Sequence, residues 1–186
     1  ARRVAMHDQL TGLPNRRHLK GVLNWLLSSN NDGRKLGVVM LNIDRFKSFN
    51  DANGRPLGDE VLMNVGKILN LRAGVDGFVA RLEGDQFVIL LPDQDEEQLM
   101  DWLSAVLTAI EVPMLVGKTS VSVSATAGAA IGPTDGRDAE TLLHRASLAQ
   151  RRAKDTSRGW FAFFKTGMDE LVRQRALFEH DLWNAV

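Results

Sequence analysis

The hydrophobic positions of this chain change period several times along its length. A helical spacing of apolar residues predicts helices over 15–29, 55–71, 95–110 and 138–154. Continuous or alternating apolar runs of strand length predict strands over 36–43, in a hairpin over 77–92, on both sides of Gly117-Lys118, and in the aromatic segment 160–164. The run at 36–43 is apolar almost throughout, which is typical of a central buried strand.

Helices that alternate with a hairpin and further strands predict one layered domain. The expected fold class is α/β (α+β), a central mixed sheet flanked by helices. We interpret residues 1–7 as the end of an incoming helix, and the amphipathic stretch 166–186 as a long closing helix. Because the chain starts with Ala1 inside a helical pattern, we expect it to be a piece of a longer protein.

Composition narrows the class of protein. The chain has 186 residues, 44% hydrophobic and 25% charged, with a formal net charge of +0. That balance gives no basic excess of the kind that nucleic-acid-binding domains show, so no nucleic-acid partner is expected. The absence of Cys excludes disulfides and thiolate metal sites. No apolar run approaches the roughly 20 residues of a membrane helix, so we expect a cytoplasmic domain without membrane contact, in a parent protein that could itself be tethered.

Polar residues gather where the buried strand ends. Asn42 and Asp44 close that strand, and Asn50 and Asp59 follow as an amide and a carboxylate suited to a purine edge. If the hairpin pairs with this strand, Asp85 lies near Asn42, and two oxygen ligands with phosphate oxygens can hold Mg²⁺.

Each of these features also has an ordinary structural explanation. An Asp beside Gly84 is common in hairpin turns. Lys154 and Arg158 could clamp a triphosphate or simply complement a helix C-terminus. Asn50 lies in a glycine-containing segment that favours turns. Only the combination of motifs favours a nucleotide site.

Four segments, in order, resemble the motifs of the GGDEF family of diguanylate cyclases. The first is "DQLTGLPNRR" at 8–17, followed by "NIDRFKSFNDANGRPLGD" at 42–59. The signature hairpin is similar to "ARLEGDQF" at 80–87, and "ASLAQRRAKDTSR" at 146–158 resembles a late helix motif. The resemblance covers almost all of residues 5–165, with the domain itself expected at 8–165, and implies a palm-like fold with a mostly antiparallel five-stranded sheet.

The resemblance implies a chemistry and a set of site residues. Family members make cyclic di-GMP from two GTP, with Mg²⁺ in each half-site of a dimer. Asn50 and Asp59 would face the guanine, and Asp85 with the Ile43 carbonyl would face the metal. The residues expected at the phosphates are Phe46, Lys47, Lys154 and Arg158.

The chain departs from the family pattern at three positions of the site. Asn42 replaces the first metal carboxylate and would give a weakened ligand, because an amide oxygen brings no charge to Mg²⁺. Glu83 replaces a glycine over which the nucleotide passes. Gln86 replaces a glutamate and cannot act as a base. The signature thus becomes Glu83, Gly84, Asp85, Gln86 and Phe87.

Three functions follow as hypotheses. In the first, the domain is a degenerate GGDEF domain, silent as a cyclase, that senses GTP and regulates an attached EAL phosphodiesterase or receptor domain. In the second, it is an active diguanylate cyclase. In the third, it binds no nucleotide and transmits signals by dimerisation. The stretch 166–186 resembles the connector helix that leads into an EAL domain.

Overall fold

The computed structural model describes residues 5–29 and 32–164. The expected helix at 166–186 lies outside the described residues, as does most of the expected incoming helix at 1–7. The described helices are α2 (Arg16–Ser28), α3 (Phe46–Asn53), α4 (Arg55–Ala73), α5 (Glu96–Glu111) and α6 (Ala139–Thr156). The strands are β1 (Leu36–Ile43), β2 (Phe78–Arg81), β3 (Gln86–Pro92), β4 (Met114–Val116), β5 (Thr119–Val121), β6 (Ala125–Gly132) and β7 (Phe161–Phe163).

A five-stranded sheet of order β2-β3-β1-β6-β7 forms the centre of the domain. Three of its pairings are antiparallel, and only β6 and β7 run parallel. This confirms the predicted mixed, mostly antiparallel sheet, the hairpin, and the aromatic edge strand. β4 and β5 form a separate two-stranded sheet. Among the described helices, none is long and apolar enough to cross a membrane.

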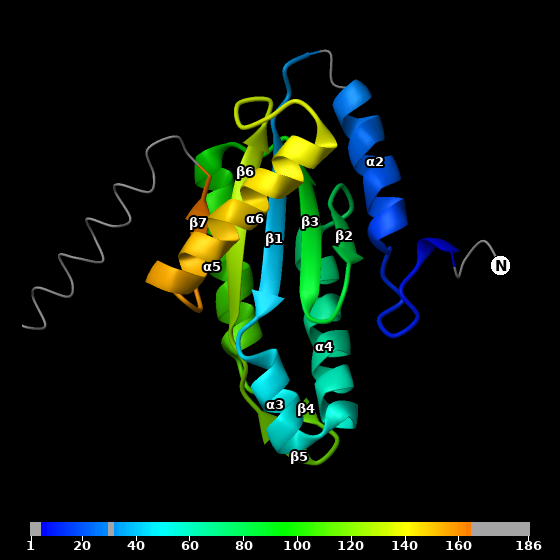
Figure 1. Ribbon diagram of the computed structural model, residues 1–186, viewed down its shortest axis with the longest axis vertical. Helices are drawn as coiled ribbons and strands as arrows, with labels where there is room; N and C mark the ends of the chain where they lie inside the picture. Colours follow the sequence, from blue (N-terminus) through cyan, green and yellow to red (C-terminus); the bar gives the residue numbers. More distant parts are fainter. Residues whose placement is uncertain (1–4, 30–31, 165–186) are drawn as a thin grey trace, which may run out of the picture.

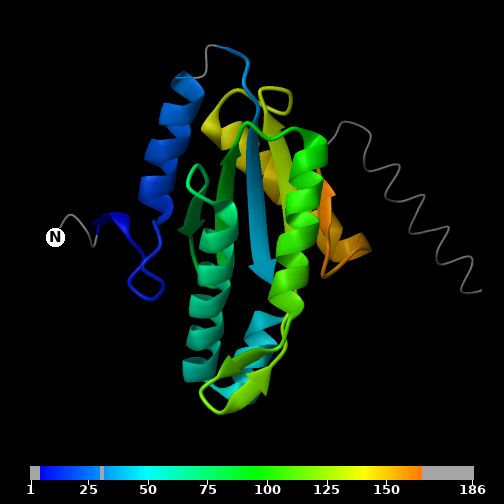
Figure 2. The ribbon, with the colours of Figure 1, turned by 180° about the vertical axis from the view of Figure 1, so that it is seen from behind.

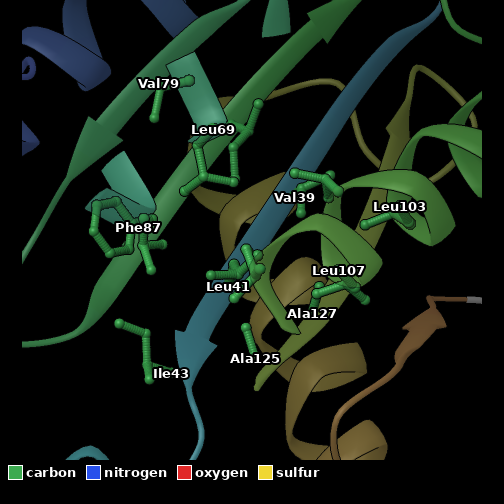
Figure 3. Close-up of a cluster of buried hydrophobic side chains, with 14 of the residues drawn as sticks. Val39, Leu41, Ile43, Leu69, Val79, Phe87, Leu103, Leu107, Ala125 and Ala127 are labelled. Carbon is green, nitrogen blue, oxygen red and sulfur yellow. The ribbon is translucent and has the colours of Figure 1, made fainter. Parts of the chain in front are cut away.

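Helices cover both faces of the sheet. Figure 1 shows α6 lying across β1 and β6, with α2 beside it, and Figure 2 shows α4 and α5 over the opposite face. Alternate residues of β1 serve the two sides: Val39 and Leu41 join the core under α4 and α5, whereas Val38 and Met40 join the core under α2 and α6. Figure 3 shows the first of these cores. The alternation places Asn42 on the α6 side.

Two local predictions were wrong. The segment after β1 was expected to be a polar break, but it forms α3, in which the rings of Phe46 and Phe49 stack 6.4 Å apart on one side of the helix. The segment after Gly117-Lys118 was expected to be one strand, but it splits into β5 and β6. The break lies at residues 122–124, and the Ser124 carbonyl accepts the Asp44 backbone N–H at 2.8 Å, in the same register as the β1–β6 pairing.

A close approach of α6 to β6 determines which α6 residues reach the sheet. A Cβ at Gly128 would lie 2.1 Å from the Gln150 backbone nitrogen and 2.4 Å from the Ala146 carbonyl oxygen. Glycine therefore allows the two backbones to touch at this point. The contact presses the middle of α6 against the end of β1 and fixes the position of Gln150.

Candidate nucleotide site

Three strand ends meet at one edge of the sheet, where β1 ends and β3 and β6 begin. The register pairs Asn42 with Gln86 on one side and with Thr126 on the other. Antiparallel pairing brings the three side chains to the same face. The α6 helix passes over that face, so this edge carries polar groups from four elements.

The signature turn is a tight hairpin turn. Gln86 donates its backbone N–H to the Glu83 carbonyl at 2.9 Å, and Gly84 has a φ of 53°. A positive φ at the first central position is where a hairpin turn of this length takes glycine. A Cβ at Gly84 would meet nothing within 4 Å, so the backbone conformation, rather than crowding, favours glycine there.

The predicted proximity of Asp85 and Asn42 is confirmed. Asn42 donates its side-chain Nδ2 to Asp85 Oδ2 at 3.3 Å. The Asn42 oxygen, Oδ1, accepts a hydrogen bond from Gln150 Nε2 at 2.5 Å. The same Gln150 nitrogen donates to the Thr126 carbonyl at 3.1 Å. Asp85 is thus linked through two amides to β6.

A second network ties the end of β1 to the loop after α6. The Asp44 carboxylate accepts hydrogen bonds from Ser124 Oγ at 2.5 Å and Thr126 Oγ1 at 2.6 Å. Thr126 Oγ1 in turn accepts the Gly159 N–H at 2.8 Å. Asp44 therefore fixes the backbone next to Arg158, rather than lying open at the strand mouth.

The predicted guanine end of the site is built on α3 and α4. Asn50 Oδ1 is buried and has no hydrogen-bond partner among the described residues. It points at Gly58, where a Cβ would lie only 1.7 Å from this oxygen. Asp59 follows Gly58 and is half-buried. A buried polar atom without a partner is costly, so this corner is suited to a ligand that hydrogen-bonds to the Asn50 amide.

The residues predicted to bind phosphates lie at the start of α3 and at the end of α6, both at this edge of the sheet. Phe46 and Lys47 open α3 directly after β1, and the Phe46 ring is half-buried while Lys47 is exposed. Lys154 lies in the last turn of α6, where it also complements the helix C-terminus, and Arg158 is exposed beyond that end. Their role at phosphates stays a prediction.

The two altered signature side chains turn away from Asp85. Glu83 is exposed, and its carboxylate lies 3.6 Å from Arg16 at the start of α2. Gln86 donates its side-chain amide to the sulfur of Met40 at 3.0 Å. Phe87 is fully buried in the core and serves packing.

An ion pair anchors the signature hairpin to the N-terminal segment. Arg81 contacts both Asp8 oxygens at 2.9 and 3.0 Å, and its Nε donates to the Gly84 carbonyl. Burial alone would raise the pKa of Asp8. The hydrogen bonds from Thr11 and Arg81 outweigh it and hold the pKa of Asp8 below its ordinary value.

These residues do not fit a resident Mg²⁺. Within the described ranges, no group of three His, Cys, Asp or Glu side chains is placed to hold a metal ion. Asn42 directs its oxygen at Gln150 and its N–H₂ at Asp85, so it faces the expected metal position with a donor. The other expected ligand is the backbone carbonyl of Ile43, so Asp85 is the one carboxylate in the expected ligand set.

Two members of the site were missed by reasoning from the sequence. Gln150 is 4% exposed and Thr126 is fully buried. A polar residue on the apolar face of a predicted helix was the available signal for Gln150, since Ala146, Ala149 and Ala153 surround it on that face. Thr126 carried no signal, because Thr is common in strands.

The fold and the site define a GGDEF domain. Residues 5–159 match the family described as "Diguanylate cyclase, GGDEF domain", so the chain belongs to this family. It is similar to the solved GGDEF domain of TpbB from Pseudomonas aeruginosa, with a TM-score of 0.84, 31% identity, and coverage of 90% of this chain and 99% of that one.

Full-length relatives extend the comparison. The chain is 32% identical over 184 residues to MucR of Pseudomonas aeruginosa, a bifunctional diguanylate cyclase/cyclic di-GMP phosphodiesterase, covering 98% of this chain and 27% of MucR. It is 31% identical over 183 residues to PdeR of Escherichia coli K12, a cyclic di-GMP phosphodiesterase, covering 98% of this chain and 28% of PdeR. The chain thus spans about a quarter of the length of these two relatives.

Proposed function

We propose that this GGDEF domain acts in cyclic di-GMP signalling as a regulatory module that binds GTP without converting it to cyclic di-GMP. One observation carries the proposal. The guanine corner keeps, beside Gly58, a buried Asn50 oxygen that has no partner in the part of the chain that the structure describes, while the Asp85 carboxylate that would face a metal is bonded to an amide. The proposed domain therefore keeps the residues that recognise guanine but has lost those that catalyse cyclic di-GMP formation.

The three sequence departures support the loss of catalysis. Gln86 cannot accept a proton, and its amide is turned to Met40. Loss of a single preorganised electrostatic group typically costs about 10²–10³ in rate. Asn42 and Gln86 each stand where the family pattern has a carboxylate, so each removes one charged group from the site.

The names of two relatives suggest which activity the domain would regulate. MucR and PdeR are phosphodiesterases of cyclic di-GMP by name, and this chain aligns over almost its whole length with about a quarter of each. We propose that the domain controls an attached EAL phosphodiesterase or receptor domain, reached through residues 166–186. Cytoplasmic location and dimerisation stay predictions.

Binding and turnover test the proposal separately. GTP is titrated into the protein by calorimetry, with ATP as the control for guanine recognition and Asp59→Asn as the matched variant. We expect saturable GTP binding that ATP does not reproduce and that Asp59→Asn weakens. No binding at millimolar GTP would remove the sensor function and favour a nucleotide-free dimerisation module.

Turnover is measured by incubating concentrated protein with GTP and Mg²⁺ and analysing the products by chromatography. We expect no cyclic di-GMP. Its formation would show an active diguanylate cyclase, as TpbB is named, and would contradict the proposed regulatory role. A longer chain that includes the downstream domain then shows whether GTP changes hydrolysis of cyclic di-GMP.

A further inference from the structure

The Asp85 carboxylate is held by a chain of amides. From β6, the Thr126 carbonyl accepts from Gln150, Gln150 donates to Asn42 Oδ1, and Asn42 donates to Asp85 Oδ2, at 3.1, 2.5 and 3.3 Å. The four residues come from β6, α6, β1 and the signature turn. These hydrogen bonds therefore join two strands, the helix and the turn at this sheet edge.

The direction of the donors in this chain follows from its two ends. A backbone carbonyl only accepts, so the Gln150 atom facing Thr126 is its N–H₂. That nitrogen also faces Asn42, whose facing atom must then be the oxygen. The remaining Asn42 group is the N–H₂, which meets the Asp85 side chain as a donor. Reversing either amide would leave two acceptors facing each other.

This direction explains why residue 42 is an amide. A carboxylate at this position would place a second negative charge within hydrogen-bond distance of Asp85, and two carboxylates so close are stable only with a proton or a cation between them. The Asn42 N–H₂ is neutral and supplies a hydrogen-bond donor to Asp85, where two carboxylates would need a cation between them. We propose that Asn42 and Gln150 together substitute for a divalent cation, so that this sheet edge is complete without metal.

The burial of Gln150 indicates that the amides that replace the cation are an integral part of the fold. Gln150 is 4% exposed, and a buried amide is costly unless its hydrogen bonds are made. Gly128 gives the α6 backbone the close approach that brings Gln150 to Asn42. The proposal deepens the proposed function and rests on it in one respect: a nucleotide bound at this site would be bound without a metal requirement.

Metal alone is the probe, with no nucleotide present. Mn²⁺ is titrated into the protein and free Mn²⁺ is followed by electron paramagnetic resonance, while thermal unfolding is compared in chelator and in millimolar Mg²⁺. We expect the parent to show no saturable Mn²⁺ binding and the same melting temperature in both buffers. Asn42→Asp should lose on the order of 5 °C in chelator and regain it with Mg²⁺.

Two further variants test the network itself. Asn70→Asp makes the same chemical change at an exposed position on α4. Its melting temperature should equal that of the parent both in chelator and in Mg²⁺. Gln150→Glu changes one amide to a carboxylate that would face the Asn42 oxygen and the Thr126 carbonyl, so it should lower the melting temperature more than Gln150→Leu, which leaves no buried charge.

Stoichiometric Mn²⁺ binding by the parent that Asp85→Asn abolishes would overturn the proposal. So would an Asn42→Asp protein that is as stable in chelator as the parent. Both outcomes are independent of GTP, so a failure of the regulatory proposal in calorimetry leaves this measurement unaffected. The parent titration decides the question even if a Gln150 variant does not fold.

Discussion

Gln150 on α6 donates its side-chain amide to Asn42 on β1 at 2.5 Å, across 108 residues of sequence. The bond joins the two amides that lead to Asp85. Asn42 was identified from the sequence as a departure from the family pattern, whereas Gln150 was not. Because the Asn42 oxygen is engaged, its N–H₂ is left to face Asp85.

Restoring the family residues should recover nucleotide binding, and removing Gln150 as well should strengthen it. We expect the triple variant Asn42→Asp, Glu83→Gly and Gln86→Glu to gain Mg²⁺-dependent GTP binding, since it returns two carboxylates and opens the turn. Adding Gln150→Leu should tighten this binding further, because the amide no longer competes for the new carboxylate. Calorimetry with and without Mg²⁺ measures both steps, and equal affinities for the triple and quadruple variants would contradict the role given to Gln150.

Gly58→Ala should weaken GTP binding strongly while lowering the stability of the domain only moderately. The new Cβ would lie 1.7 Å from Asn50 Oδ1, the mobile end of a side chain, so the amide should rotate away at a cost of about 1–2 kcal/mol. GTP affinity should fall by roughly tenfold or more, because a lost hydrogen bond to the base leaves a buried group unpaired.

The matched control is Gly21→Ala on α2, where a Cβ meets nothing within 4 Å. That change should stabilise the domain by about 0.5–1 kcal/mol through helix propensity and leave GTP affinity unchanged. Urea unfolding and calorimetry give the two quantities. A Gly58→Ala protein with full affinity would exclude Asn50 from the guanine site.

Gly128→Ala should be far more damaging than Gly58→Ala. Its Cβ would lie 2.1 Å from the Gln150 backbone nitrogen and 2.4 Å from the Ala146 carbonyl oxygen, and backbone cannot rotate aside. Moving α6 away from β6 would also break the Gln150 bonds. We expect a loss on the order of 3–5 kcal/mol in the free energy of unfolding, measured in urea. A loss under 1 kcal/mol would mean that α6 shifts freely on the sheet.

The Asp8–Arg81 pair predicts a dependence of stability on pH. Because the folded state lowers the pKa of Asp8, the stabilisation is fully present above the unfolded value of 3.8 and is lost as pH falls through the lower folded pKa. Asp8→Asn should therefore cost about 1–2 kcal/mol at neutral pH and less as pH drops below 3.8.

Asp101→Asn, an exposed change on α5, is the control for this pH series. It should follow the parent at every pH. Chemical unfolding at several pH values between neutral and acid measures the difference. A constant difference between parent and Asp8→Asn across the series would exclude Asp8 as a source of acid sensitivity.

The sequence predicted most of the secondary structure because periodicity is local. The apolar run at 36–43 became β1 with its expected bounds, and the hairpin and four helices were placed to within a few residues. The α3 helix was missed because it is short, largely polar and uncapped, following an Arg45 with a φ of 51°. The predicted single strand after Gly117-Lys118 is two strands, because Thr119–Val121 pairs with β4 whereas Ala125–Gly132 pairs with β1, and no local pattern contains that change of partner.

For the site, the sequence by itself determined which groups are available. It placed an amide at 42, a carboxylate at 85 and a glutamine at 86. The expected pairing of the hairpin with the 36–43 strand brought Asp85 beside Asn42, as the structure confirms. Only the tertiary structure decided which atom of Asn42 faces Asp85. That orientation depends on hydrogen bonds from Gln150 to Asn42 and to the Thr126 carbonyl. These partners lie far from Asn42 in the sequence, so the spacing of residues along the chain does not predict which group donates and which accepts.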